Sequence, residues 1–324
     1  MLVTGANGFV GSHLVEALLA QGYAVRCLVR RTSDLAFIQD LPVEWAYGDI
    51  ARGDGLEAAC EGIDAVCHLA GATKARDRET YFCVNAEGTR RLLNACEQAA
   101  PDLRRFVYAS SLAAAGSSPD GRPIDESRPP RPLTWYGQSK LQGEQFCHEY
   151  EDRLPVVILR AAAVYGPRER DIYFYFQTVN RGIKLLLGRG ERRARFIFVQ
   201  DFVTLILRAL EDERAAGQIY FAAEGRDYDW REVSEMVAEA LGKRAARVTL
   251  PEWLLPVIAA AAGFQARITK RPALLNEQKL IELRQPYWVC SAEKARRELG
   301  FEAQHDLATG LRLTAQWYRE NGWL

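Results

Sequence analysis

Residues 4–11 read Thr4-Gly5-Ala6-Asn7-Gly8-Phe9-Val10-Gly11 and follow directly on an apolar run, Met1–Thr4. The segment after them, Ser12–Gln21, is amphipathic, so the quoted stretch joins a predicted strand to a predicted helix. Glycines at 5, 8 and 11 allow a tight turn, a close approach of the backbone to a pyrophosphate, and close packing of helix on strand. The helix N-terminus presents free N–H groups to the anion. The stretch therefore predicts a loop that binds the phosphates of a dinucleotide.

Apolar and amphipathic segments alternate through the first half of the chain. The further strand candidates are Ala24–Val29, Val43–Gly48, Ala65–Leu69, Phe106–Ser110 and Val156–Arg160. Val84–Gln98 and Tyr136–Tyr150 are predicted helices between them. Strands that are apolar almost throughout are typical of a sheet covered on both faces. We predict an α/β fold with a doubly wound parallel sheet.

After Pro167 the alternation loosens, which predicts a smaller C-terminal substrate lobe. We assign residues 1–165 to a dinucleotide-binding domain, with 193–224 returning to it, and residues 166–192 and 225–324 to the lobe. The longest apolar run, Trp253–Phe264, is shorter than the roughly 20 residues that span a bilayer. We interpret it as a lid helix over the substrate, with an interfacial membrane contact as the alternative.

Composition excludes several classes of function. Of the 324 residues 48% are hydrophobic, and Lys+Arg and Asp+Glu both number 42, so no basic excess exists for a nucleic-acid partner. The seven cysteines show no CxxC spacing and the four histidines form no HxxxH or HExxH pattern, so we expect no disulfide and no metal site. No signal peptide precedes the first motif, and we expect a cytoplasmic protein.

A tyrosine and a lysine lie one turn apart on one predicted helix face in Tyr136-Gly137-Gln138-Ser139-Lys140. A phenol has a reference pKa of about 10, and a nearby ammonium favours its ionised form. Tyr136 is therefore suited to give a proton to a carbonyl or to take one from an alcohol. A predicted strand ends in Ser110-Ser111, at the sheet edge where ligands of such folds bind.

The order of these motifs resembles that of the extended short-chain dehydrogenases/reductases, a superfamily that includes NAD-dependent epimerases and dehydratases. The glycine spacing is similar to their TGxxGxxG form, and the resemblance runs from Val3 to the C-terminal helices. It implies a Rossmann fold and a catalytic set of Ser111, Tyr136 and Lys140. Ser111 and Tyr136 would bind the substrate oxygen, while Lys140 would hold the nicotinamide ribose and lower the pKa of the tyrosine.

The resemblance also implies a set of cofactor contacts. Gly48-Asp49-Ile50 is similar to the segment that places a carboxylate against the adenine amino group, and His68-Leu69-Ala70-Gly71 to the strand end along the ribose and phosphates. Asn85 resembles a helix asparagine that contacts or positions the cofactor. The full set is Gly5, Asn7, Gly8, Phe9, Val10, Gly11, Arg30, Asp49, Ile50, Leu69, Ala70, Gly71, Asn85, Tyr136 and Lys140.

The end of the second predicted strand indicates which nicotinamide cofactor is used. An acidic residue there binds the ribose hydroxyls of NAD, and a basic one pairs with the 2′-phosphate of NADP. Val29 stands where the acidic residue would fall, and Arg30 and Arg31 follow it. We favour NADP(H), with NAD(H) as the alternative and two solvated arginines as the simpler explanation.

The segment Ala161-Ala162-Ala163-Val164-Tyr165-Gly166-Pro167 separates two branches of the resemblance. Ala163 stands where nucleotide-sugar enzymes commonly carry an asparagine that reaches the diphosphate, and Ala194 stands where they carry an arginine. Ala161 replaces a proline that is frequent in the dehydrogenase branch. Arg193, Arg195 and Lys74 remain as cations for a diphosphate.

We therefore expect an NAD(P)-dependent oxidoreductase acting on an apolar ketone or secondary alcohol, nearest the 3β-hydroxysteroid dehydrogenase and dihydroflavonol reductase branch. The alternative is an NAD-dependent nucleotide-sugar epimerase or dehydratase. A non-catalytic regulator on the same fold is a third interpretation, against which the intact serine, tyrosine and lysine argue. The family commonly dimerises through the helices interpreted here as Val84–Gln98 and Tyr136–Tyr150, so we expect a homodimer.

Overall fold

The structure is a computed structural model that describes residues 1–188, 190–254, 257 and 277–324. Its centre is a sheet of seven strands in the order β11-β6-β5-β4-β1-β2-β3, in which every neighbouring pair is parallel. These strands are β1 (Leu2–Thr4), β2 (Arg26–Val29), β3 (Glu44–Tyr47), β4 (Ala65–His68), β5 (Arg105–Ser111), β6 (Val156–Ala161) and β11 (Gln218–Ala222). The predicted parallel α/β sheet is confirmed, with strand ends shifted by one or two residues.

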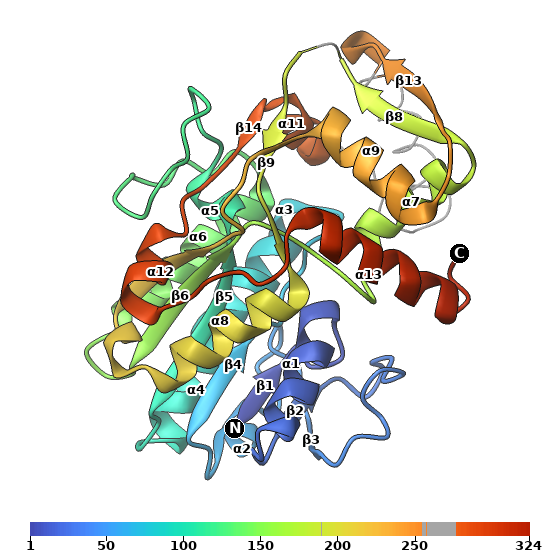
Figure 1. Ribbon diagram of the computed structural model, residues 1–324. Coiled ribbons are helices and arrows are strands. Elements are labelled where there is room, and N and C mark those ends of the chain that lie inside the picture. The colour runs from blue at the N-terminus through green and yellow to red at the C-terminus, as the bar shows by residue number, and fades with distance from the viewer. Residues whose placement is uncertain (189, 255–256, 258–276) are drawn as a thin grey trace.

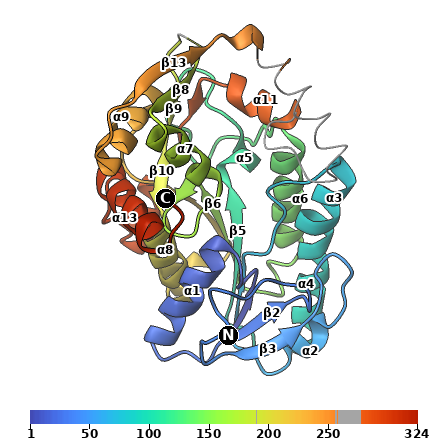
Figure 2. The ribbon, with the colours of Figure 1, turned by 90° about the vertical axis from the view of Figure 1, so that its right-hand side faces the viewer.

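Helices cover both faces of this sheet (Figure 2). The first face carries α1 (Phe9–Ala20), α8 (Val199–Glu211) and α12 (Glu293–Leu299), and the second α2 (Leu56–Cys60), α4 (Gly88–Ala99) and α6 (Trp135–Glu149). Successive residues of one strand pack on opposite faces of the sheet: Val107 belongs to the first core, and its neighbours Phe106 and Tyr108 belong to the second. The sheet is therefore doubly wound.

Short elements extend the carboxyl edge of the sheet toward the site. They are α3 (Arg78–Phe82), a π-helical turn η1 (Cys83–Glu87) that runs into α4, and α5 (Leu112–Ala115). Asp77 caps α3 by accepting a hydrogen bond from Thr80 N–H at 2.8 Å, and Ser111 caps α5 by accepting one from Ala113 N–H at 3.1 Å. Ser111 is thus both the last residue of β5 and the N-cap of α5.

A smaller lobe sits over that edge (Figure 1). Its helices α7 (Asp171–Asn180), α9 (Trp230–Leu241) and α13 (Leu307–Glu320) share an aromatic-rich core with Phe176, Tyr228 and Tyr318. Its short sheets pair β12 (Tyr228–Asp229) and β14 (Tyr287–Trp288) with β9 (Arg193–Ala194), β7 (Ala163–Tyr165) with β10 (Phe196–Phe198), and β8 (Ile183–Leu187) with β13 (Ala246–Leu250). The stretch 193–224 thus contributes β9 to the lobe and β11 to the main sheet.

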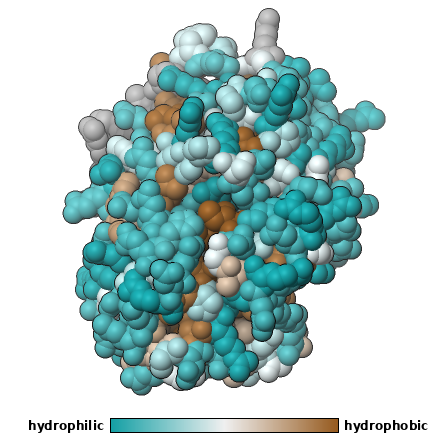
Figure 3. Space-filling view, turned by 90° about the vertical axis from the view of Figure 1, so that its left-hand side faces the viewer, coloured by the Kyte–Doolittle hydropathy of each residue, from teal (hydrophilic) through white to brown (hydrophobic). Residues whose placement is uncertain are grey.

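The face of the molecule seen in Figure 3 is largely polar (Figure 3). On this face, apolar residues gather mainly in a narrow central band between hydrophilic regions. Most of the predicted helix Trp253–Phe264 lies outside the described residues. Of this stretch, the structure describes only Trp253, Leu254 and Val257. In the described part of the chain, no helix combines the length and apolar character needed to cross a bilayer.

Candidate functional site

The strand order places a binding edge between β1 and β4. From β1 the chain moves outward to β2 and β3, and it then returns to β4 on the other side and continues to β5, β6 and β11. The loops that leave the carboxyl ends of β1 and β4 therefore diverge, and ligands of open α/β sheets bind in the crevice between such loops. Residues 5–11 follow β1, residues 69–71 follow β4, and Ser111 ends β5, so the structure brings these predicted segments to one edge.

Two positions in the loop after β1 require glycine. Gly5 has φ +68°, and a Cβ there would lie 2.7 Å from Ala70 N in the loop after β4. A Cβ on Gly11 would lie 2.1 Å from Gly5 O, so the first turn of α1 packs directly on the turn that precedes it. Both contacts are to backbone atoms that no side-chain rotation can relieve, and a larger residue would move the helix away from the strand.

The N-terminus of α1 fits the pyrophosphate of a dinucleotide. Its N-cap is Gly8, which offers no side-chain acceptor, and no acidic residue lies in the first turn. The first-turn N–H groups of a helix lack intrahelical acceptors, and the helix dipole favours an anion there. Gly8 N–H donates to Gly5 O at 2.9 Å and closes the turn, while Asn7 Nδ2 donates to Asp34 O at 3.1 Å and holds the loop after β2 beside it.

A buried histidine ties the ends of β1 and β4 together. His68 bonds Thr4 Oγ1 through Nδ1 at 2.7 Å and Thr89 Oγ1 through Nε2 at 3.0 Å. Burial lowers the pKa of His68 to about 3, so its ring is neutral at physiological pH. Ala70 N–H also donates to Thr4 Oγ1 at 3.2 Å, which extends the network into the predicted cofactor segment. His68 thus has a structural role, for which sequence reasoning offered no specific signal.

Asn85 positions the loop after β4. Its Oδ1 accepts a hydrogen bond from Ala72 N–H at 2.7 Å, and its Nδ2 donates to Ala72 O at 3.0 Å and to Ser139 Oγ at 2.9 Å. Of the two roles that the sequence left open for Asn85, this geometry favours positioning, because its amide donors and acceptor bind protein atoms. The loop that carries Gly71 is thereby fixed to the helix that carries the tyrosine and the lysine.

The predicted adenosine end lies at the carboxyl ends of β2 and β3. Arg30 follows β2 and is exposed, and in the described residues its guanidinium has no hydrogen-bond or ion-pair partner. Arg31 differs, since its guanidinium carbon lies 4.7 Å from the centroid of the Tyr47 ring. Asp49 Oδ1 accepts the Ala51 N–H at 2.9 Å, and Ile50 is buried against the start of α4. A basic side chain without a partner among the described residues thus stands at the end of β2.

The candidate catalytic side chains come from β5 and α6. Thr134 caps α6 by accepting Gly137 N–H at 3.1 Å, so the helix begins immediately before Tyr136. Burial raises the pKa of Tyr136 to about 12, and a hydrogen bond with Ser111 opposes the increase. The tyrosine is thus protonated at neutral pH, with its hydroxyl beside that of Ser111.

Lys140 differs from the sequence expectation in one respect. Its ammonium lies 4.1 Å from the centroid of the Tyr108 ring, and burial lowers its pKa to about 8 while the Glu144 carboxylate opposes that decrease. Its charge is therefore balanced by Tyr108 and Glu144, and the pKa of Tyr136 is raised by burial, not lowered. The expected decrease of the tyrosine pKa by Lys140 is not seen in this arrangement.

Sequence reasoning missed a buried ion pair beneath these residues. Arg160 of β6 donates to Glu144 of α6 through Nε at 3.0 Å and Nη2 at 2.7 Å, and Ser110 Oγ donates to the same carboxylate at 2.5 Å. The two charged side chains are only 3% and 1% exposed. The network joins β5, β6 and α6, so it fixes the helix that carries Tyr136 and Lys140 relative to the strand that ends in Ser111. A charged residue inside an otherwise apolar strand was the available signal.

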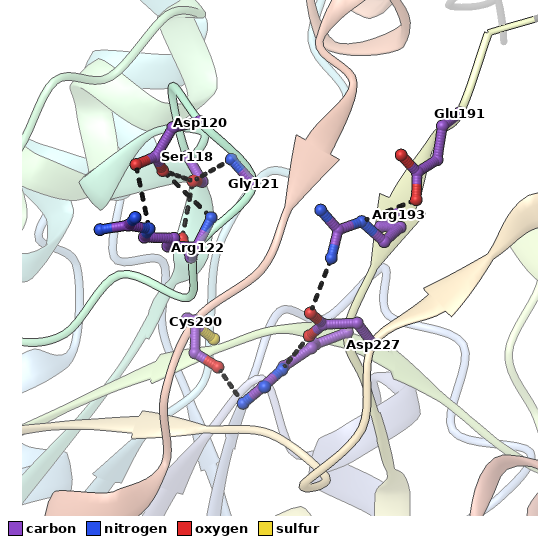
Figure 4. Close-up of polar contacts among 9 residues, drawn as sticks. Ser118, Asp120, Gly121, Arg122, Glu191, Arg193, Asp227 and Cys290 are labelled. Carbon is purple, nitrogen blue, oxygen red and sulfur yellow. Dashed lines mark hydrogen bonds and ion pairs between the residues drawn. The ribbon is translucent and has the colours of Figure 1, made fainter.

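The cations that could receive a diphosphate are bound to carboxylates of the chain. Arg195 donates to Asp227 Oδ1 at 2.5 Å and to Cys290 O at 2.6 Å, and Arg193 lies 3.5 Å from Asp227 Oδ2. Figure 4 shows Asp227 facing Arg193, which also forms an ion pair with Glu191 at 3.2 Å. Lys74 pairs with Asp171 of the lobe. Ala194 is buried in β9 and Ala163 is exposed. In the described part of the chain, no group of three or more potential metal-ligating side chains occurs.

Comparisons with known proteins place the chain among dinucleotide-dependent enzymes. Residues 1–223 match the family described as the NAD dependent epimerase/dehydratase family. The chain is 30% identical to ceramide reductase of Caulobacter vibrioides over 99% of its length and 95% of the relative. It is 32% identical to sterol demethylase protein B of Methylococcus capsulatus, with 99% and 98% covered. A solved UDP-glucuronic acid 4-epimerase from Bacillus cereus in complex with NAD is 25% identical, with 99% and 98% covered and a TM-score of 0.79.

Proposed function

This chain belongs to the NAD-dependent epimerase/dehydratase family, and on that premise we propose that it is a carbonyl reductase or alcohol dehydrogenase of the extended short-chain type. Its substrate is a largely apolar ketone or secondary alcohol. Relatives named for ceramide and for sterols support an apolar substrate class, as does a 3β-hydroxysteroid dehydrogenase of Mycobacterium tuberculosis that is 31% identical, with 93% of this chain and 85% of the relative covered.

The chain's residues hold the substrate oxygen and move one proton. The nicotinamide supplies or accepts the hydride when it is bound. Tyr136, protonated at neutral pH, gives its hydroxyl proton to the carbonyl oxygen during reduction and recovers it during oxidation. Ser111 Oγ accepts the Ala113 N–H, and its hydroxyl, which is hydrogen-bonded to Tyr136 in this structure, can donate to the same substrate oxygen once the substrate is bound. Lys140 supplies the positive charge beneath the site.

The observation that carries the substrate class is the state of the three cations. A diphosphate would have to compete with Asp227 for Arg195 and with Asp171 for Lys74, and each displaced carboxylate would lose its counter-charge. Arg195 and Asp227 are 12% and 18% exposed, so solvent screens their pair less than it screens Lys74 and Asp171, which are 36% and 54% exposed. Without those cations a diphosphate would lose its water and gain no counter-charge.

A nucleotide-sugar epimerase or dehydratase is the second candidate function. It is favoured by the fold similarity to solved enzymes of that class, including UDP-glucose 4-epimerase of Thermus thermophilus, which is 27% identical with 98% of each chain covered and a TM-score of 0.79. The two candidates share the tyrosine, the lysine and the cofactor, and they differ in what occupies the lobe side of the site.

Two properties of the assembly complete the proposal. We propose that Arg30 gives a preference for NADP(H), because its exposed guanidinium lies free at the end of β2.

We also propose a homodimer. Large apolar residues of α4 and α6, such as Leu92, Leu93 and Phe146, are buried in the monomer core, while Asn94 and Gln145 are exposed. The dimer therefore rests on the family resemblance alone, and light scattering that reports only a 36.4 kDa species would contradict it.

Calorimetry and reductase assays on the same preparation separate the two candidate functions. Titration with UDP, GDP and dTDP should show no binding at micromolar concentration, while oxidation of NADPH should accompany the reduction of steroid, flavonoid or β-keto substrates. Micromolar binding of any of the three nucleotides, with no reduction across the panel, would establish the epimerase candidate instead.

A further inference from the structure

The helix α11 (Glu277–Arg284) of the lobe turns a polar face toward the catalytic residues. Gln278, Glu282 and Gln285 are spaced by four and three residues, so they share one face of the helix and its end. Gln278 Oε1 accepts the N–H of Trp135 at 2.8 Å, and Ser117 Oγ donates to Gln285 Oε1 at 3.3 Å. The face is therefore held against the dinucleotide-binding domain at both of its ends.

Between these two anchors Glu282 is held close to Tyr136. Trp135, which Gln278 binds, is the residue before Tyr136, and Glu282 lies one helical turn after Gln278 on the same face. The indole Nε1 of Trp288 donates to Glu282 O at 3.1 Å, which also fixes the backbone at this point. The rings of Tyr81 and Tyr136 are neighbours, with their centroids 6.2 Å apart.

Electrostatics agree with this placement. Burial is the main cause that raises the pKa of Tyr136 and of Tyr81, and the Glu282 carboxylate raises both further. One carboxylate oxygen, Oε2, accepts a hydrogen bond from Lys279 Nζ at 2.8 Å. The other oxygen, Oε1, has no hydrogen-bond partner in the described part of the chain. An acceptor thus stands beside the proton-transfer group, on the side that the substrate lobe supplies.

We propose that Glu282 is a specificity-determining residue that accepts a hydrogen bond from an N–H or O–H group that the substrate carries close to its reacting carbonyl. The inference rests on the proposed reductase function and narrows its substrate class. The Glu282 side chain is 22% exposed and its Oε2 binds Lys279, so an apolar ketone without a donor would displace water from Oε1 and leave that acceptor oxygen without a hydrogen bond. A ketone with an amide N–H or a hydroxyl beside its carbonyl would satisfy it.

The discrimination should be large, since sites built to bind a donor reject analogues that lack it far more strongly than apolar pockets reject a missing methylene. Two matched pairs of long-chain ketones test this: an α-acylamino ketone with its α-acyloxy analogue, and an α-hydroxy ketone with its α-methoxy analogue. For the wild type, kcat/KM should favour the donor-bearing member of at least one pair by about 30-fold or more.

Variants of α11 then assign the preference to its source. Glu282→Ala should reduce the preference to within about threefold of unity, and Glu282→Gln, which keeps an acceptor oxygen, should retain part of it. Glu277→Gln removes an exposed carboxylate from the same helix and should leave the ratio unchanged. Equal affinity for the cofactor in all four proteins shows that the fold is intact.

The outcomes separate the inference from the function on which it rests. Reduction of both members of each pair at similar rates by the wild type, or an undiminished preference in Glu282→Ala, would overturn the role of Glu282 and leave the reductase standing. No reduction of any ketone by the wild type would overturn the reductase and the inference together.

Discussion

The dinucleotide-binding half and the substrate lobe use charge in opposite ways. Around α1 the chain leaves donors open: the helix has an uncapped N-terminus, and Arg30 at the end of β2 has no ion-pair partner in the described residues. In the lobe, by contrast, the cations are paired with carboxylates: Asp227 binds Arg193 and Arg195, and Asp171 binds Lys74. Open donors fit an anion that is always part of the reaction, and closed ones fit a substrate that brings no anion. The first half is thus suited to an anionic ligand, and the second half to a ligand without negative charge.

The largest expected effect comes from the proton-transfer group between the two halves. Tyr136→Phe should reduce kcat by about 10²–10⁴-fold, because the group that gives the proton is lost while its ring remains. Cofactor affinity, measured by fluorescence titration, should stay within about twofold of the wild type. A variant that kept wild-type turnover would show that another group transfers the proton.

The free N–H groups at the start of α1 are positioned by a close backbone contact between Gly11 and Gly5. Gly11→Ala should abolish measurable cofactor binding, or weaken it by about 100-fold or more, because its Cβ would fall 2.1 Å from Gly5 O. Gly225→Ala is the matched control, since no heavy atom lies within 4 Å of a Cβ there. If both variants bound the cofactor equally well, the packing of α1 on the loop would not be what forms the phosphate site.

Local features of this kind were predictable from the sequence, and tertiary ones were not. The glycine loop, the Tyr136–Lys140 pair and the buried strands follow from spacings within one or two turns, where backbone geometry alone decides which residues meet. The pairs Arg160–Glu144 and Arg195–Asp227, and the approach of Glu282 to Tyr136, join segments 16, 32 and 146 residues apart. No periodicity encodes such contacts, because they depend on how separate elements pack. The raised pKa of Tyr136 has the same origin.

Arg30 offers a test of the open donors at the adenosine end. Arg30→Ala should weaken NADP(H) binding by about 1.5–3 kcal/mol, the range for a charge-assisted hydrogen bond, and leave NAD(H) binding nearly unchanged. Calorimetric titration of both cofactors against both proteins measures this. Equal affinities for the two cofactors in the wild type, unaltered by the substitution, would contradict the preference.

The buried His68, which ties the ends of β1 and β4 together, should make the stability of the fold depend on pH. Folded His68 has its pKa lowered to about 3 by burial, whereas unfolded histidine has a pKa of about 6.5. Between these values only the unfolded chain binds the proton, so this residue contributes a loss of stability as pH falls, about 1.4 kcal/mol per pH unit below pH 6. Urea unfolding at pH 7, 6 and 5 should show a shallower dependence in His68→Gln. Identical slopes in both proteins would contradict this assignment.

The closed cations of the lobe give the smallest expected effect. Asp227→Asn removes the carboxylate that binds both Arg193 and Arg195, so the variant should gain weak UDP binding, by about threefold to tenfold over the wild type. Asp227→Asn combined with Arg195→Ala should lose that gain. An unchanged affinity in the single variant would mean that the two arginines are not what the acid holds away from a diphosphate.

The direct test of the central claim is to follow the hydride itself. Purified enzyme is incubated with NADPH that carries deuterium at the transferred position and with an apolar ketone, and the product is analysed by mass spectrometry. The account predicts net oxidation of one cofactor per alcohol formed, with one deuterium on the carbinol carbon. Interconversion of UDP-sugars without net cofactor oxidation, and with no deuterium in any alcohol, would contradict it.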